Sequence, residues 1–522
     1  MTFVSEAIPS HAVDWRLLLP TQKMEQILLI ERGDSDFTRS FRELKIPVQT
    51  VSNLTDLPTR GDFDLIAAPL GLDTPASLST VRGLLRPGGS LLFGFTRQET
   101  SLPTITRSLH ELGFRSIQFF AAIPDLISPE YIMPLDAQAL SFMLEHRYEH
   151  KLPQLALQAV RGGILSPFMG VVRHLLPNFF AIASDGGETF SDALMPYVTS
   201  RSPQPLRWTL HTNGGADLND NVIFLGFEQG KQNPSLVAKV PRLPSNNWVL
   251  KTEHERLSEI WHLLGEEAPR RLPEPVALAE INGQAALVIS YVEGHGLIHS
   301  SRQGLWRDPA RLLVLARDAA HSLRQIHERA STPLVAGERT PSDLPLKIKS
   351  FRKLFLPNAD ESRLLNELEQ TELMQGATHK TLLQGDFWHG NLIRDAKHGE
   401  LMLIDWQYAR WDTNVSLDVY LFLLAGALAN TPSRDAREKA HGAAELLKQW
   451  RAEVIPAYLK AYGVAYNFSL LPALYGMTQC CVEKATRAAL DFGNNQSDAE
   501  AWRWLFAELD YMYLNGDFFN DI

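Results

Sequence analysis

The sequence predicts a chain of two domains: an α/β domain with a doubly wound sheet over about residues 1–200, and an α+β domain over about residues 201–522. Three observations lead to this prediction. Strand-like and helix-like segments alternate in the first part of the chain, which is typical of a doubly wound sheet. Consecutive strand-like segments open the second part, and helix-like segments dominate the rest. A length of 522 residues leaves room for both domains.

The elements of the first domain follow one another as strand, helix, strand. Apolar runs at residues 25–31, 48–51 and 63–69 predict buried strands, and the segment after the first run predicts a helix through Phe41 and Leu44. A fourth strand-like run covers residues 85–95. Turn-forming residues at 184–188 and 200–205 place the domain boundary before Leu206.

Three segments rich in β-branched and aromatic residues open the second domain, at 208–211, 222–227 and 236–240, and predict three antiparallel strands. The loop at 212–221 contains Gly214 and Gly215. Paired glycines let backbone N–H groups approach a phosphate, although such a loop by itself is also an ordinary hairpin connection. Lys239 follows Val-Ala on the third strand, where a lone lysine is usually a solvated edge residue.

The next two segments predict a helix and a buried strand. Residues 251–264 carry apolar side chains on one helical face, and Glu253 stands one turn before Leu257, in position to pair with Lys239. Glu255 is a neighbouring alternative, and a glutamate that favours the helix dipole explains either position. Residues 285–297 read as a buried strand that breaks at a glycine.

Two acids and an amide occupy the positions that phosphoryl transfer to an alcohol requires. The run 382–393 places Asp386 and Asn391 five residues apart in a short loop, and the apolar run 401–404 delivers Asp405 at its end. Asp386 is placed to accept the hydroxyl proton, while Asn391 and Asp405 would hold Mg²⁺ on ATP. Hydrogen bonds that only knit the loop together are the alternative interpretation.

These segments resemble the catalytic segments of the aminoglycoside phosphotransferase and choline kinase superfamily, which are relatives of the protein kinases. The family pattern is His-Gly-Asp, four residues, Asn, and then Ile-Asp-Trp or Ile-Asp-Phe. This chain keeps Asp386, Asn391 and Asp405 in that pattern, but has Gln384 where the family usually carries His. The resemblance implies a protein-kinase-like fold with an N-lobe at about 205–292 and a C-lobe at about 293–522.

The resemblance also implies roles for residues outside the catalytic loop. Lys239, held by Glu253, would touch the ATP phosphates together with the glycines of the 212–221 loop. Backbone groups of Ser290, Tyr291 and Val292 would meet the adenine edge, with Tyr291 or Val292 as an apolar wall. Asp418, early in a following helix, would brace the catalytic loop without taking part in the chemistry.

The first domain resembles the later half of class I methyltransferase domains over roughly residues 14–185. The run Leu-Arg-Pro-Gly-Gly-Ser-Leu-Leu-Phe at 85–93, preceded by Phe-Asp-Leu-Ile at 63–66, carries this resemblance. The cofactor turn after the first strand is reduced to residues 31–35, with one glycine instead of three. We therefore favour a degenerate methyltransferase-like scaffold over an active methyltransferase that binds S-adenosylmethionine.

Composition excludes several classes of function. The 50 Lys and Arg residues are scattered among 60 Asp and Glu, so no nucleic-acid footprint is expected. The most apolar late segment, about 415–429, is too short to span a bilayer and contains Asp418, and the N-terminus does not read as a signal peptide. A cytoplasmic protein is the expectation. The two cysteines, Cys480 and Cys481, are adjacent and predict reduced buried thiols.

The function predicted from these features is an ATP- and Mg²⁺-dependent phosphotransferase. It would act on a hydroxyl of a small molecule such as a sugar, an amino alcohol or an aminoglycoside-like compound. One alternative is a bifunctional kinase and methyltransferase that modifies a saccharide. Another is a non-catalytic, nucleotide-binding scaffold. The sequence leaves open the acceptor, the choice of ATP or GTP, and the oligomeric state.

Overall fold

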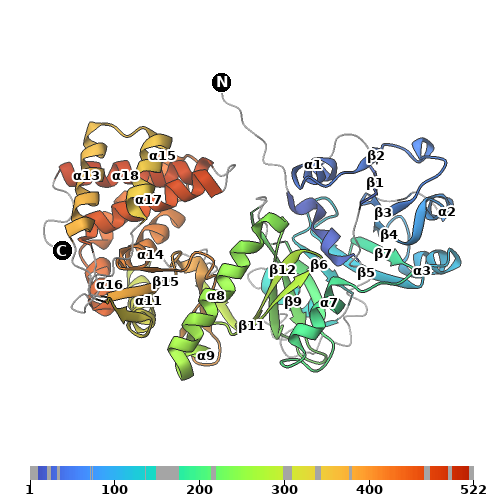
Figure 1. Cartoon of the computed structure of the whole chain (residues 1–522), viewed down its shortest axis with the longest axis horizontal. Coiled ribbons are helices and arrows are strands. Elements are labelled where there is room, and N and C mark those ends of the chain that lie inside the picture. The colour runs from blue at the N-terminus through green and yellow to red at the C-terminus, as the bar shows by residue number, and fades with distance from the viewer. Residues whose placement is uncertain are drawn as a thin grey trace. The chain divides into compact units, whose positions relative to one another are not determined.

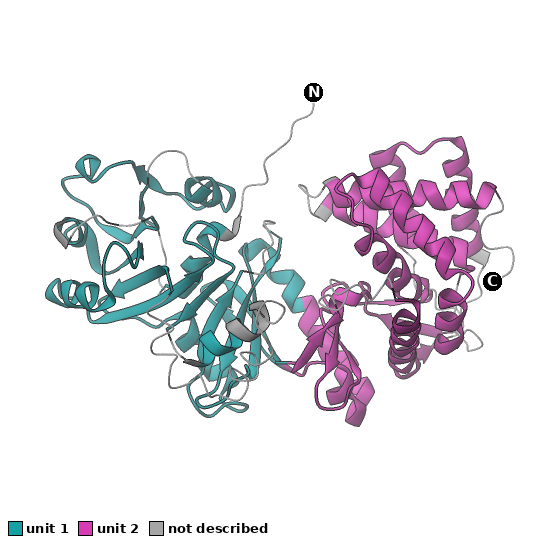
Figure 2. Cartoon of the chain, turned by 180° about the vertical axis from the view of Figure 1, so that it is seen from behind, with its two compact units in different colours: residues 1–251, 276–291 teal, residues 252–275, 292–522 magenta. Residues whose placement is uncertain are grey.

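The computed structural model describes residues 10–19, 25–31, 36–70, 72, 75–135, 137–148, 176–212, 219–297, 308–335, 343–374, 379–463, 471–491 and 496–515. The chain forms two compact units (Figure 2). Unit 1 comprises residues 1–251 and 276–291, and unit 2 comprises residues 252–275 and 292–522. The units therefore divide the chain at other positions than residue 200, and the predicted domain boundary stays a prediction.

Within the described residues, one sheet of twelve strands forms the centre of unit 1 (Figure 1). In spatial order its strands are β11 (Pro275–Ile281), β12 (Gln284–Ser290), β10 (Leu236–Pro241), β9 (Asn221–Phe227), β8 (Arg207–His211), β6 (Tyr131–Pro134), β5 (Ser116–Ile123), β7 (Asn178–Ser184), β4 (Leu85–Thr96), β3 (Phe63–Ala68), β1 (Ile27–Ile30) and β2 (Gln49–Val51). The block β2-β1-β3-β4 is parallel. Strand β7 is antiparallel to both β4 and β5, which makes the sheet mixed.

Helices cover both faces of the parallel block because its strands are apolar on both sides. Alternate residues such as Leu29 and Leu65 pack on one face with η1 (Ser10–Leu18), α1 (Asp36–Glu43) and α7 (Phe190–Val198). Their neighbours, such as Leu28 and Ile66, pack on the other face with α2 (Pro75–Arg82) and α3 (Leu102–Glu111). This double covering agrees with the predicted doubly wound arrangement, while the methyltransferase resemblance stays a prediction.

The antiparallel strands β8, β9 and β10 follow one another as the sequence predicted, and β12 pairs with β10. A short antiparallel pairing between β6 and β8 joins them to the rest of the sheet. The joint is reinforced by Thr212, whose N–H donates to Glu130 O at 3.0 Å and whose hydroxyl donates to Pro129 O at 2.8 Å. One apolar cluster runs from η1 and α1 through to β10 and β12. The N-terminal strands and this antiparallel group therefore share a single core.

Unit 2 is mainly helical, with two small sheets ordered β13-β16-β17 and β14-β15-β18. Its strands are β13 (Gly294–Gly296), β14 (Ser331–Pro333), β15 (His379–Leu383), β16 (Leu392–Asp395), β17 (Leu401–Leu403) and β18 (Arg410–Asp412). Its longer helices are α11 (Pro309–Arg329), α12 (Leu344–Phe355), α13 (Ala359–Met374), α14 (Ser416–Ala429), α15 (Ala436–Trp450), α16 (Val454–Tyr462), α17 (Ala473–Asp491) and α18 (Gln496–Leu514). Helix α8 (Asn247–Leu264) contains the division between the units.

Helix α17 occupies a central place in unit 2. It packs against α18, α14 and α12, and most of its side chains are buried, including Cys480 and Cys481. Both thiols are free, as predicted. Among the helices of the described ranges, none combines the length and apolar character that a membrane span requires.

Candidate functional site

The predicted catalytic loop leaves β15 through a sharp turn. Gly385 adopts φ +76°, and a Cβ at this position would overlap the backbone oxygen of Tyr408, so only glycine fits here. The turn points Asp386 into a largely buried setting, with 8% of its surface exposed. The nearby His389 is buried as well, and burial lowers the pKa of His389 to about 4, so this imidazole is neutral at physiological pH.

Gln384, the departure from the family pattern, ties the two catalytic segments together. Its Nε2 donates to the carbonyl oxygens of Ile404 at 3.2 Å and Asp405 at 2.6 Å. Its Oε1 accepts from the Asp386 N–H at 2.8 Å. A glutamine offers both a donor and an acceptor, so one side chain fixes the backbone of both acids. Gln384 therefore has an architectural role in this loop.

Asp418 braces the same loop from α14. Its two carboxylate oxygens accept from the backbone N–H groups of Gln384 at 2.7 Å and Gly385 at 2.8 Å. The fully buried His327 lies behind it, with Nε2 3.2 Å from Asp418 Oδ2 and Nδ1 2.8 Å from the Tyr462 hydroxyl. The structural role predicted for Asp418 is thus confirmed.

Asn391 and Asp405, the predicted metal ligands, lie on adjoining backbone. The N–H of Ile404 donates to Asn391 O at 3.0 Å, and Asp405 follows with φ +63°. The Asn391 amide donates through Nδ2 to Asp386 O at 3.0 Å and to Asp386 Oδ2 at 3.1 Å. Because Nδ2 donates to Asp386, the amide oxygen points away from that residue. Mg²⁺ prefers oxygen ligands, and the role of this oxygen as a ligand stays a prediction.

The donor set suits Mg²⁺ held on a nucleotide better than a closed metal site. Within the described ranges, no group of three or more His, Cys, Asp or Glu side chains could hold an ion. One carboxylate and one amide, completed by phosphate oxygens and water, is the usual arrangement for Mg²⁺ on a nucleotide.

Glu253 on α8 is buried and faces the Asp405 segment. Its Oε1 accepts from the Trp406 N–H at 3.2 Å, and 1% of its surface is exposed. Glu255, the alternative candidate, is exposed to solvent. Glu253 is thus the buried member of the pair, and its functional role stays a prediction. Lys239 and Glu253 belong to different units, and their pairing stays a prediction.

The predicted nucleotide residues of unit 1 lie on its antiparallel strands. Lys239 is buried on β10, opposite Ile223 and Leu287, and Ser290 ends β12 opposite Leu236. The Tyr291 N–H donates to Ser235 O at 3.0 Å, so any adenine contact would use other backbone groups of this segment. The remaining candidates are Val292, which is buried, and Gly214 and Gly215, which lie outside the described residues.

Two basic residues of α17 contact the catalytic loop, and sequence reasoning did not find them. Lys484 Nζ lies 2.5 Å from Asp386 Oδ1, and Arg487 donates to Gly385 O at 3.2 Å. Burial raises the pKa of Asp386, but the Lys484 ammonium and the Arg487 guanidinium outweigh it and hold the pKa below its usual value. Asp386 is therefore ionised at neutral pH. The available signal was the run of charged residues inside an otherwise apolar helix.

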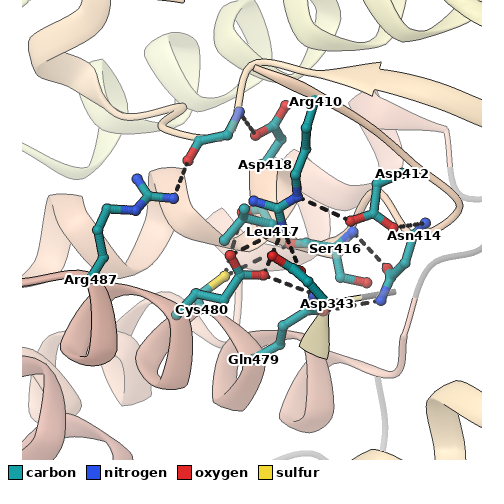
Figure 3. Close-up of polar contacts among 12 residues, drawn as sticks. Asp343, Arg410, Asp412, Asn414, Ser416, Leu417, Asp418, Gln479, Cys480 and Arg487 are labelled. Carbon is teal, nitrogen blue, oxygen red and sulfur yellow. Dashed lines mark hydrogen bonds and ion pairs between the residues drawn. The ribbon is translucent and has the colours of Figure 1, made fainter. Parts of the chain in front are cut away.

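A buried polar cluster centred on Arg410 extends beside these contacts (Figure 3). Arg410 contacts both oxygens of Glu483 at 2.8 and 3.0 Å and Asp412 at 3.3 Å. Burial alone would lower the pKa of Arg410, but these carboxylates raise it, so the guanidinium stays charged. The amide of Asn414 donates to Gln479 at 3.0 Å and completes the link between α17 and the segment before α14.

Part of the chain matches the model of a known protein family. Residues 215–467 match the model of the phosphotransferase enzyme family, a range that contains Lys239, Glu253, Asp386, Asn391 and Asp405. No curated protein sequence matches the chain.

Two solved structures are similar to part of the chain. One is aminoglycoside phosphotransferase APH(3'')-Id from Streptomyces rimosus, with 16% identity and a TM-score of 0.34, covering 59% of this chain and 97% of that one. The other is the same protein in complex with ADP and streptomycin, with 18% identity and a TM-score of 0.32, covering 59% of this chain and 98% of that one.

Proposed function

We propose that this chain transfers the γ-phosphoryl group of ATP to a hydroxyl of a small molecule, because residues 215–467 match the model of the phosphotransferase enzyme family. The observation that carries the proposal is the environment of Asp386. An ionised carboxylate stands at the start of the loop that also holds Asn391, beside the segment that ends in Asp405. These are the parts that phosphoryl transfer to an alcohol requires.

In this mechanism Asp386 orients the acceptor hydroxyl and receives its proton as the phosphoryl group moves in line. Asp418 holds the backbone before Asp386 and Gln384 holds the N–H of Asp386 itself, so the carboxylate keeps its direction without reorganisation. Asn391 and Asp405 would hold Mg²⁺, which neutralises charge on the phosphate oxygens when it is bound.

Lys239, the segment 290–292 and the loop glycines would bind the nucleotide. Lys239 would supply a positive charge to its phosphates, and Ser290, Tyr291 and Val292 would line its base. Gly214 and Gly215 would let backbone N–H groups approach the phosphates. Glu253 would support the Asp405 segment, since its carboxylate already accepts a hydrogen bond from the next residue, Trp406.

The test is an Asp386→Asn variant. It keeps the size of the side chain and removes the proton acceptor, so ATP binding should stay within about twofold while turnover falls roughly a hundredfold or more. The measurements are ATP affinity by calorimetry in the presence of Mg²⁺, and ADP formation with a panel of hydroxyl acceptors. The Asp405→Ala variant should instead lose the Mg²⁺-dependent part of ATP binding. Unchanged turnover in the Asp386→Asn variant would refute the assignment.

For the N-terminal region we propose a scaffolding role. Its strands continue into the sheet that carries Lys239, and Thr212, which precedes the glycine loop, is held by Glu130, Pro129 and Arg242. The reduced turn at residues 31–35 speaks against close approach of S-adenosylmethionine, and residues 32–35 lie outside the described residues. A thermal-shift titration with S-adenosylmethionine tests this proposal, and clear stabilisation would favour the bifunctional alternative.

A further inference from the structure

Both oxygens of the Asp386 carboxylate have donors, and these come from distant parts of the chain. Asn391, within the loop, donates to Oδ2 at 3.1 Å, and Lys484, on α17, contacts Oδ1 at 2.5 Å. We propose that Lys484 is a positioning residue that fixes Asp386 and places a positive charge beside the acceptor hydroxyl, so that the enzyme selects neutral or acidic acceptors against cationic ones. This inference rests on the proposed function and narrows its acceptor class.

The contact is not an ordinary surface ion pair. The side chain of Lys484 is 20% exposed and that of Asp386 is 11% exposed, so both are mostly buried. Ion pairs between exposed side chains, in contrast, contribute little to stability. Helix α17 is anchored on the same loop by Arg487, whose guanidinium donates to Gly385 O and lies 3.9 Å from the centroid of the Tyr408 ring. Lys484 is therefore presented by a helix that is fixed at the loop itself.

Two cationic side chains contact the Asp386 carboxylate. Arg487 Nη1 lies 3.6 Å from Asp386 Oδ1, and Lys484 Nζ lies 2.5 Å from the same oxygen. The acidic residue of α17 next to Lys484 is Glu483, and Arg410 engages both of its oxygens. The nearby polar residues Thr478, Gln479 and Thr486 of α17 carry no charge. An acceptor hydroxyl bound at Asp386 Oδ1 would therefore lie close to the Lys484 ammonium.

This arrangement separates the acceptor classes by charge. A sugar or polyol hydroxyl can accept a hydrogen bond from Lys484 while it donates to Asp386, and a nearby carboxylate or phosphate on the acceptor would add attraction. An ammonium group close to the reacting hydroxyl, as in an amino alcohol or an aminoglycoside, would be repelled by Lys484. Discrimination of this kind needs the repulsive element as much as the attractive one.

The experiment compares acceptors of similar size and different charge: glucose, gluconate, glucosamine and choline, with water as the reference acceptor. ADP formation is measured for the wild-type chain, Lys484→Met and Lys484→Arg. Lys460→Met, which removes an exposed lysine of α16, is the matched control.

Lys484→Met should lower kcat at least tenfold with KM for ATP unchanged, and Lys484→Arg should restore part of kcat. The wild-type kcat/KM should be at least tenfold higher for the neutral or acidic sugars than for the cationic acceptors, and Lys484→Met should narrow that ratio.

The outcomes separate this inference from the proposed function. Phosphoryl transfer that needs Asp386 but is unchanged in Lys484→Met, or that prefers glucosamine or choline, overturns the inference and leaves the proposed function standing. If no acceptor, including water, gives ADP formation that Asp386→Asn abolishes, the proposed function fails and the inference fails with it. A folding defect in Lys484→Met is recognised by its unfolding midpoint against that of Lys460→Met, and the acceptor preference of the wild-type chain then decides.

Discussion

At the scale of single residues, the catalytic loop depends on positions that carry no chemistry. Gln384 replaces the expected His and still bonds both catalytic segments, because an amide can donate to Asp405 O and accept from Asp386 N–H at the same time. Gly385 provides the backbone conformation that presents Asp386. The sequence motif identified Asp386, whereas only the structure shows the hydrogen bonds of Gln384 and the backbone conformation of Gly385.

Gly385→Ala should destabilise the folded protein for two separate reasons. The side chain would adopt φ +76°, and its Cβ would overlap the Tyr408 carbonyl oxygen, so the free energy of unfolding should fall by about 2 kcal/mol or more. Gly399→Ala is the matched control, since Gly399 has φ +71° but nothing within 4 Å of the added Cβ, and about 1 kcal/mol is expected there. Urea denaturation of both variants measures the difference. Equal losses would show that the loop moves aside at Tyr408.

At the scale of elements, the predicted strands and helices were largely recovered. The segments 208–211, 222–227 and 236–240 became β8, β9 and β10, and the apolar run 401–404 became β17 followed by Asp405. Periodicity and turn residues act locally, so the sequence carries them directly. The contribution of α17 to the site was not predicted, because Lys484 and Asp386 are 98 residues apart and no spacing rule joins them.

The contact between α13 and α18 predicts a pH-dependent stability. Burial, reinforced by Asp360 on α13, raises the pKa of Asp510 to about 6 from 3.8. The native state therefore binds this proton more tightly than the unfolded chain, and stability is lost as the pH rises through about 6. Asp510→Asn should remove that loss. After allowance for solvent screening, the free energy of unfolding of the variant should exceed that of wild type by about 1 kcal/mol at pH 7.5. The difference between the two proteins should be smaller at pH 5.

Urea denaturation at the two pH values measures the gap for Asp510→Asn. Glu500→Gln serves as the control, because Glu500 is exposed on the same helix. A gap for Asp510→Asn that is equal at pH 5 and pH 7.5 would contradict the assignment of this pH dependence to Asp510.

At the scale of the whole molecule, the two parts that read as separate domains in the sequence share a sheet and a core. Asp14 and Arg242, 228 residues apart, form a fully buried ion pair with contacts at 2.9, 3.0 and 3.1 Å. Strand β8 pairs with β6, so the strands expected to bind nucleotide have no free edge on that side within the described residues. The compact units accordingly divide the chain after residue 251 and not near residue 200.

A chain of residues 201–522 should therefore not fold into a soluble monomer. Removal of residues 1–200 exposes the edge of β8 and part of the shared apolar cluster, and it leaves Arg242 buried without Asp14. Soluble yield and size-exclusion chromatography, with the full chain as the control, measure the outcome. A monomeric, cooperatively unfolding fragment would support the predicted boundary near residue 200 and two independent modules.

The sequence by itself determined the motif that contains Asp386, the order of most strands and helices, and the match of residues 215–467 to the model of the phosphotransferase enzyme family. These depend on local spacing, in which Asp386, Asn391 and Asp405 are read from one short stretch of chain. The tertiary structure alone decided which groups surround Asp386 and where the compact units divide. Contacts such as Lys484 with Asp386 and Asp14 with Arg242 join residues that only the folded chain brings together, because long-range packing and burial select them and no local pattern encodes them.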